Sequence, residues 1–109
     1  MRLLLDENLP KKLKFDFLEY EIFTIREKGW NGIKNGDLLK LMLENSFDAL
    51  LTFDKNLQFQ QNFKKYTIAV FVLSATINTY DMLTKLSPKV KLILKKHPLP
   101  IGAIVVENT

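Results

Sequence analysis

Four acidic residues stand where apolar runs end or where a helix begins, and these side chains are best placed to do chemistry. Asp6 and Glu7 follow a short leucine run, Asp54 follows a second apolar run, and Asp37 begins an amphipathic segment. Two carboxylates about 4 Å apart repel by ~4 kcal/mol at an effective dielectric constant near 20, and a divalent cation relieves that repulsion. Oxygen ligands and the absence of cysteine favour Mg²⁺ or Mn²⁺ over zinc. We expect a metal ion at Asp6, Asp37 and Asp54, with a bound water as the nucleophile.

The apolar pattern indicates which elements would position these acids. Strands are expected over Leu3–Leu5, Glu21–Ile25, Phe47–Phe53, Thr67–Leu73 and Ile101–Val106. Helices are expected from Pro10, from Asp37, over Leu57–Tyr66 and over Thr79–Lys95, the last bent or broken at Pro88. Alternating strands and helices, with strands apolar on both faces, predict one α/β domain over residues 1–109 with a mainly parallel five-stranded sheet between helices. Ligands of such sheets bind beyond the carboxyl ends of the strands.

Each acid also has a simpler structural explanation. Asp37 after Gly36 is a natural helix-start residue, because backbone capping and the helix dipole both favour an acid there. Glu7 could be a first-turn acid of the following helix, and Asp54 could initiate a turn. Asp6 and Asp54 follow separate strands whose carboxyl ends share one edge of the sheet, so the pair together favours a functional site.

Polar and aromatic neighbours could support the acids. Asn8 either caps the first helix or holds a ligating carboxylate in place. Lys11 and Lys55 either neutralise substrate phosphates or belong to solvated faces. Trp30 either stacks on a base or anchors its glycine-flanked loop in the core.

Composition excludes several classes of protein. The 109 residues include no cysteine, and no stretch approaches the ~18 apolar residues of a membrane span. The run Leu3–Leu5 is too short for a secretory signal, and acids follow it at once, so we expect a cytoplasmic protein without a membrane partner. The net charge of +4 suits a polyanionic ligand, but a charge this small hardly distinguishes a nucleic-acid-binding protein from other proteins.

Three segments resemble a known family. LLLDENLP, REKGWNGIKNGDLL and LLTFDKNL are similar to the DUF5615 group of PIN-like proteins, a branch of the PIN nuclease superfamily, and the similarity runs from Met1 to about Leu73. The resemblance implies a PIN-like three-layer α/β/α domain whose acids bind Mg²⁺ or Mn²⁺. Asp6 and Glu7 take the first acidic position, Asp37 the helix-start acid, and Asp54 the acid of a Thr-x-Asp motif with Thr52 beside it. Related domains are ribonucleases, many of them toxins held inactive by a small antitoxin protein.

One departure from the family concerns the number of metal ions. PIN-like sequences often carry a further acid two residues after the Thr-x-Asp aspartate, and this chain has Asn56 there. An amide oxygen can ligate a metal but brings no charge. We therefore expect one ion and leave a second open.

The leading hypothesis is an Mg²⁺- or Mn²⁺-dependent endoribonuclease, the toxin of a toxin–antitoxin pair, with RNA as substrate; a homodimer is left open. A receiver-like phosphoacceptor domain is an alternative, with Asp54 as acceptor and Ser74 as sensor. Against it, Glu107 stands after the last strand where receivers carry a lysine, and Asp54 and Ser74 are close in sequence. A catalytically inactive PIN-like binding module is the third hypothesis.

Overall fold

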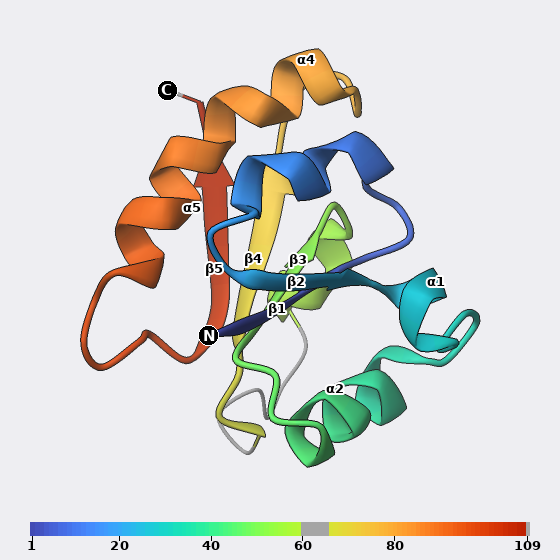
Figure 1. Ribbon diagram of the computed structural model, residues 1–109. Helices are drawn as coiled ribbons and strands as arrows, with labels where there is room; N and C mark the ends of the chain where they lie inside the picture. Colours follow the sequence, from blue (N-terminus) through green and yellow to red (C-terminus); the bar gives the residue numbers. More distant parts are fainter. Residues whose placement is uncertain (60–65, 109) are drawn as a thin grey trace.

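The three inner strands of the sheet are buried on both faces, and such strands need helices on both sides. The computed structural model describes residues 1–59 and 66–108 (Figure 1). All five predicted strands are confirmed, with small shifts at their ends, and the sheet is parallel throughout in the order β2-β1-β3-β4-β5. The strands are β1 (Arg2–Leu5), β2 (Glu21–Thr24), β3 (Ala49–Thr52), β4 (Ala69–Ser74) and β5 (Gly102–Glu107).

The helical segments agree less closely with prediction. They are η1 (Lys11–Phe17), α1 (Ile25–Lys28), α2 (Asn35–Glu44), η2 (Lys55–Phe59), α4 (Tyr80–Leu83), η3 (Thr84–Leu86) and α5 (Ser87–Leu94). The helix expected after Pro10 is a 3₁₀ helix, and α1 was not predicted. The expected helix Leu57–Tyr66 falls mostly on residues 60–65, outside the described residues.

The helix expected over Thr79–Lys95 is broken next to Pro88, as predicted. The 3₁₀ turn η3 directly precedes α5, and Pro88 lies in the first turn of α5. A proline has no N–H to donate to the carbonyl four residues earlier, here that of Thr84, so an unbroken α-helix loses a hydrogen bond at this point. In the first turn of a new helix the missing N–H costs nothing, because those N–H groups have no intrahelical partner.

Helices cover both faces of the sheet, as expected for an α/β/α domain (Figure 1). Leu3 and Leu5 of β1 pack on one side, in a core that also holds Phe17 of η1 and Val90 of α5. Leu4 points to the opposite side, into a core that includes the buried residues of α2. This alternation follows from the two-residue period of a strand. Within the described residues, no helix is long and apolar enough to cross a membrane.

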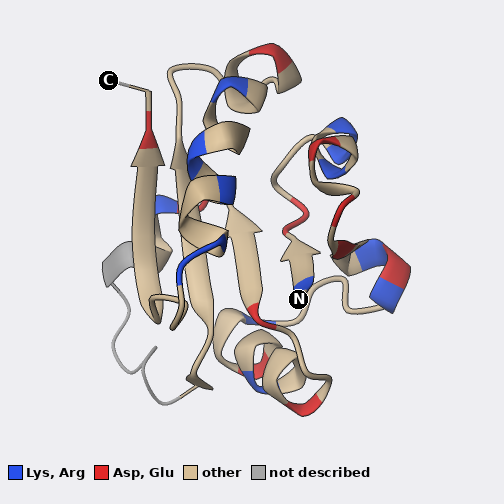
Figure 2. Cartoon of the chain, turned by 60° about the vertical axis from the view of Figure 1, so that its left-hand side comes forward, with Lys and Arg blue, Asp and Glu red and all other residues tan. Residues whose placement is uncertain are grey.

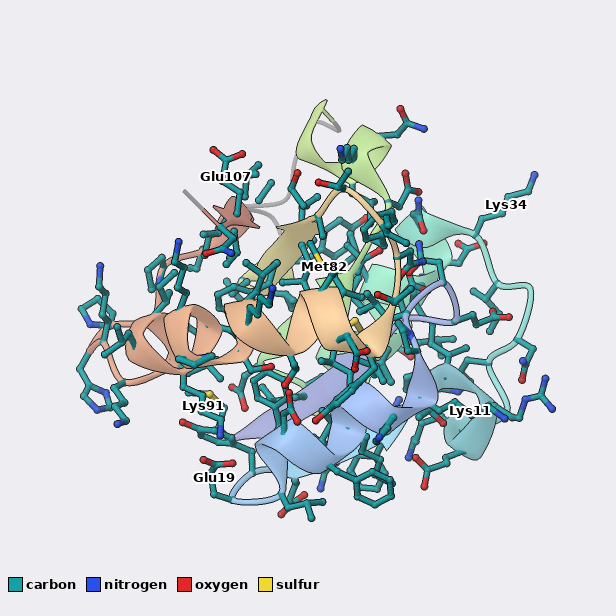
Figure 3. The ribbon with its side chains drawn as sticks, turned by 90° about the horizontal axis from the view of Figure 1, so that it is seen from above. Lys11, Glu19, Lys34, Met82, Lys91 and Glu107 are labelled. Atoms are coloured by element: carbon teal, nitrogen blue, oxygen red, sulfur yellow. The ribbon has the colours of Figure 1, made fainter. Side chains whose placement is uncertain are left out.

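An acidic side chain holds η1 against the helices beside it. Asp16 of η1 accepts hydrogen bonds from the hydroxyls of Tyr80 (2.7 Å), Thr84 (2.6 Å) and Ser87 (2.7 Å). Burial by itself would raise the pKa of Asp16, but these three donors outweigh it and lower the pKa. An ion pair of 3.0 Å between Lys91 and Glu19 adds a second link at the outer end of the same layer (Figure 3).

The strand order places a topological switch point between β1 and β3. The chain leaves β1 for the edge strand β2, then returns past β1 to β3 and continues outward to β4 and β5. Neighbouring strands whose connections run in opposite directions leave a crevice at their carboxyl ends, where ligands of such sheets bind. Asp6 follows β1 and Asp54 closely follows β3, so both flank this point.

Candidate acidic site

Asp6 is held in one position by hydrogen bonds from both sides of the switch point. Its backbone N–H donates to the Leu51 carbonyl at 2.9 Å, which extends the pairing of β1 with β3 by one residue. Its carboxylate accepts the Glu7 N–H at Oδ1 (2.8 Å) and the Thr52 hydroxyl at Oδ2 (2.6 Å). The acidic segment lies directly beyond the arrow of β1 in Figure 2.

The pKa of Asp6 is raised, first because burial penalises its charged form. The negative charges of Glu7 and Asp54 raise the pKa further, whereas the hydrogen bonds from Thr52 and from the Glu7 N–H oppose the shift. The contribution of Asp54 is the smallest of these, so its charge acts on Asp6 only weakly. Two like charges at the carboxyl ends of neighbouring strands are an arrangement that a bound cation would relieve.

Thr52 joins the two acids. It is the last residue of β3 and is completely buried. Its hydroxyl donates to Asp6 and accepts hydrogen bonds from the Asp54 N–H at 3.1 Å and from the Asn8 amide at 3.4 Å. One buried oxygen thus sets the Asp6 carboxylate relative to the backbone that carries Asp54.

Asn8 bridges the segments that follow β1 and β3. Its side-chain oxygen accepts the Phe53 N–H at 3.1 Å, and its carbonyl accepts a hydrogen bond of 2.6 Å from Asn78. Asn8 does not cap η1, whose capping position is Pro10, so the capping interpretation is wrong. The structure instead places the Asn8 side chain against Thr52, one contact away from Asp6.

Asp54 keeps a free carboxylate oxygen. Its Oδ1 accepts the Asn56 N–H at 3.0 Å, while Oδ2 takes no hydrogen bond from any described residue. The Asn56 side chain is exposed and is likewise without a hydrogen bond in the described part of the chain. An unused carboxylate oxygen and a nearby amide oxygen are both suitable ligands for a hard cation.

Glu7 turns toward the glycine-rich loop. Its Oε1 accepts the Gly32 N–H at 3.2 Å, and its Oε2 lies 3.5 Å from the Asn31 amide. Glu7 is an exposed residue of the turn after β1 and not a first-turn helix acid. It therefore ties the loop between α1 and α2 to the edge of the sheet where Asp6 lies.

Asp37 and Trp30 lie apart from this hydrogen-bond network. Asp37 is exposed in the first turn of α2, whose capping residue is Lys34, and its side chain forms no hydrogen bond or ion pair within the described residues. The Trp30 ring packs edge-on against Phe47 with centroids 5.7 Å apart, next to the Lys28 ammonium. Trp30 thus takes the position of a loop anchor at the edge of the core.

A metal ion fits the site only as a two-carboxylate centre. Across residues 1–59 and 66–108, no three acidic or histidine side chains come together closely enough to form a metal-binding group, so Asp37 does not join Asp6 and Asp54. Mg²⁺ in proteins is commonly bound by one or two carboxylates and keeps several waters. Asp6 and Asp54 would supply the two carboxylates of one such ion, and the expectation of one ion rather than two stays a prediction.

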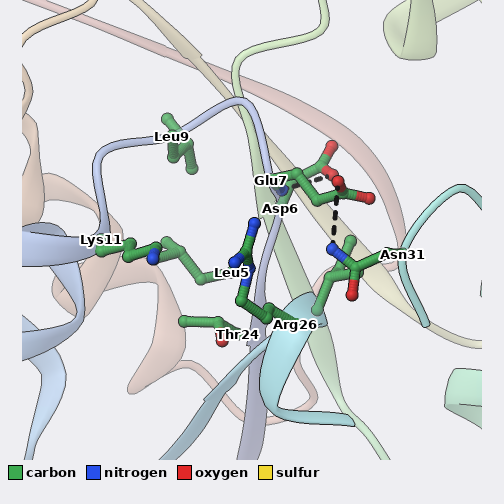
Figure 4. A pocket seen from close by; sticks show the side chains of 9 residues that line it. Leu5, Asp6, Glu7, Leu9, Lys11, Thr24, Arg26 and Asn31 are labelled. Carbon is green, nitrogen blue, oxygen red and sulfur yellow. Dashed lines mark hydrogen bonds between the residues drawn. The ribbon is translucent and has the colours of Figure 1, made fainter. Parts of the chain in front are cut away.

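Two pockets flank the acids along the carboxyl edge of the sheet. On the β2 side, a cavity of about 120 Å³ is lined by Asp6, Glu7, Lys11 and Arg26 (Figure 4). On the other side, an open pocket of about 340 Å³ includes Lys55. The two predicted lysines thus lie on opposite sides of the acids. Arg26 was not predicted to belong to the site. It directly follows the expected strand Glu21–Ile25, as Asp6 follows Leu3–Leu5, so its position in the sequence was a signal.

The fold and the site together define a doubly wound parallel α/β protein with two carboxylates beside its switch point. Comparisons with protein-family models, with curated proteins and with solved structures find no match for the chain. Membership of the DUF5615 PIN-like group therefore stays a prediction that rests on the three sequence segments.

Proposed function

We propose that the protein is an Mg²⁺- or Mn²⁺-dependent endoribonuclease that uses Asp6 and Asp54 to hold one metal ion. The observation that carries the proposal is the pairing of these acids at the switch point, where the charge of Asp54 raises the pKa of Asp6 and Thr52 contacts both residues. When bound, the ion lowers the pKa of a coordinated water and neutralises charge on the phosphate. The expected products carry 5′-phosphate and 3′-hydroxyl ends.

Neighbouring side chains would position the two acids and the RNA phosphates. Thr52 fixes the Asp6 carboxylate, and Asn8 fixes the segment that carries Asp54. Lys11 and Lys55 lie in pockets on either side of the acids, where their ammonium groups can neutralise flanking phosphates. Cations on both sides support cleavage within a strand rather than at its end.

The cellular role in this proposal is that of a toxin controlled by a small antitoxin protein. Its support is the sequence resemblance alone. Co-purification of the chain with the product of a neighbouring reading frame, followed by loss of ribonuclease activity in the complex, is the expected result. An active complex would contradict the antitoxin assignment.

Substitution of the two acids tests the ribonuclease directly. Asp6→Asn and Asp54→Asn should abolish Mn²⁺-dependent cleavage of a labelled single-stranded RNA, measured on denaturing gels. Glu44→Gln is the matched control, because Glu44 is exposed at the end of α2, before β3 begins, and so lies toward the amino ends of the strands. Cleavage that persists in a pure Asp6→Asn preparation would overturn the proposal.

Asp6→Asn should not weaken folding. A raised pKa means that the ionised Asp6 costs stability above its folded-state pKa, and that stability returns as the pH falls toward the unfolded-state pKa. The neutral amide removes this cost at pH 7 but has one acceptor oxygen where Asp6 uses two, and we expect these opposing effects to cancel. A melting temperature at or above that of the wild type would separate loss of chemistry from loss of structure.

A receiver-like phosphoacceptor is the second candidate, because the order β2-β1-β3-β4-β5 is also that of receiver domains. Asp54 would accept the phosphoryl group, and Ser74 at the end of β4 would sense it. Glu107 pairs with Ser74 in the sheet, so an acid stands where the phosphorylated form needs a cation. Incubation with acetyl phosphate and Mg²⁺ should therefore leave Asp54 unmodified by mass spectrometry, and a phosphoryl adduct would favour this candidate.

A further inference from the structure

Two cationic side chains line the cavity beside Asp6. Lys11, the first residue of η1, and Arg26, in α1, both border the 120 Å³ space together with Asp6 and Glu7 (Figure 4). Both come from elements at the carboxyl ends of β1 and β2, although they are distant in sequence. The cavity thus joins cations to the proposed metal-binding acids.

Neither cation is neutralised by a neighbour. Lys11 and Arg26 form no ion pair or side-chain hydrogen bond within the described residues, although two acids border the same cavity. By contrast, Lys14, which borders a surface shared with Lys11 and Arg26, lies 2.9 Å from Glu27. The unpaired charges are therefore available to an anion from solution.

Both acids accept hydrogen bonds from groups other than the two cations. Asp6 is occupied by the Glu7 N–H and the Thr52 hydroxyl, and Glu7 is turned toward Gly32 and Asn31. The two acids therefore border the cavity without forming an ion pair with Lys11 or Arg26 among the described residues.

The backbone that carries Arg26 is held at both ends of its short helix. Its helix α1 begins with a capping box, in which the Thr24 hydroxyl accepts the Glu27 N–H and the Glu27 carboxylate accepts the Thr24 N–H. The same helix ends at Gly29 in the left-handed conformation, with φ of 73°. A short helix fixed at both ends holds the backbone of Arg26 at the cavity.

We propose that Lys11 and Arg26 bind a backbone phosphate of the RNA next to the one that is cleaved, on the β2 side of Asp6. This inference rests on the proposed ribonuclease function and deepens it. A guanidinium can hold two phosphate oxygens at once, and an ammonium adds a point charge. The phosphate group that these two cations suit is the same for every nucleotide of the strand. The subsite therefore recognises backbone rather than sequence.

Binding of a fluorescent single-stranded oligoribonucleotide tests the subsite without requiring cleavage. Fluorescence anisotropy is measured in EDTA over a series of salt concentrations for the wild type, Arg26→Gln and Lys11→Gln. Each lost phosphate contact should reduce the slope of log affinity against log salt by ~0.7, which is about fivefold in affinity at 0.1 M salt relative to 1 M salt. Arg26→Lys keeps the charge and should restore the slope.

Lys96→Gln is the matched control, because Lys96 is an exposed lysine just after α5, before β5 begins, and so lies toward the opposite edge of the sheet. It should leave affinity and slope unchanged. Wild-type behaviour in Arg26→Gln and Lys11→Gln, an equal loss in Lys96→Gln, or no binding by the wild type would each overturn the subsite.

The subsite and the ribonuclease can fail separately. If the wild type cleaves RNA and both variants bind RNA as the wild type does, the subsite is refuted and the ribonuclease proposal stands. If Arg26→Gln and Lys11→Gln both weaken RNA binding but the wild type cleaves no RNA at any Mn²⁺ concentration, the phosphate-binding site stands and the ribonuclease proposal is refuted.

Discussion

Replacing Thr52 by valine should weaken the fold and disturb the acidic site at the same time. The two side chains have nearly the same shape, so the change removes one buried hydroxyl and leaves packing almost intact. That hydroxyl donates to the Asp6 carboxylate at 2.6 Å and accepts the Asp54 N–H at 3.1 Å. The Asn8 contact at 3.4 Å is longer and contributes little.

The expected cost follows from these contacts. A hydrogen bond to a charged group contributes about 1.5–3 kcal/mol, and an N–H left without a partner costs about 1–3 kcal/mol. The added methyl group of valine returns about 0.8 kcal/mol through burial. We expect a net loss of about 2–5 kcal/mol, which lowers the melting temperature by roughly 10–20 °C in a domain of this size.

Urea unfolding followed by circular dichroism measures the loss, with Thr76→Val at an exposed loop position as the control. Asp6→Asn combined with Thr52→Val completes a double-mutant cycle, in which we expect a coupling energy of about 1–2 kcal/mol. A loss below ~0.5 kcal/mol, or zero coupling, would refute the assignment of Thr52 as the link. The pKa of Asp6 should rise further in the valine variant, because the Thr52 hydrogen bond lowers it in the wild type.

Two further substitutions test the supports of the site. Asp16 has a lowered pKa, so its contribution is present above the unfolded-state pKa and is lost as the pH falls through the folded-state value. Asp16→Asn should therefore cost about 1–2 kcal/mol at pH 7 and reduce the loss of stability below about pH 4; urea midpoints with an unchanged acid dependence would contradict this. Gly29→Ala should cost about 1 kcal/mol through its φ of 73° alone, because no atom lies within 4 Å of the added methyl. A neutral effect on thermal unfolding would contradict that strain.

The strands were predictable from sequence because their signal is local and redundant. The segments at Leu3 and Val70 are apolar at consecutive positions, which only a strand buried on both faces explains in so short a run. The order of the strands was not predictable. It depends on which side of β1 each crossover returns to, and no single residue records that choice.

The helical segments were harder because several are too short to show a periodic pattern. The helix α1 has four residues, yet Thr24 and Glu27 form a capping box that was present in the sequence. The 3₁₀ geometry of η1 was not predictable, because its support is tertiary: Asp16 is bonded by three hydroxyls from a distant part of the chain. That contact had no local signal.

In the acidic site, too, local signals allowed some positions to be predicted, whereas others depend on tertiary packing. Asp6 and Asp54 were found because strand ends in a parallel sheet have known neighbours, whereas the direction of Asp37 depends on how α2 packs. The helix buries Leu38 and Leu39 against the sheet, and Asp37 remains exposed in the first turn, where the helix dipole by itself favours an acid. Glu7 is different, because its charge already acts on Asp6. If a third carboxylate approaches the metal ion, Glu7 can reach it by releasing the loop hydrogen bond to Gly32, whereas Asp37 would require movement of α2 as a whole.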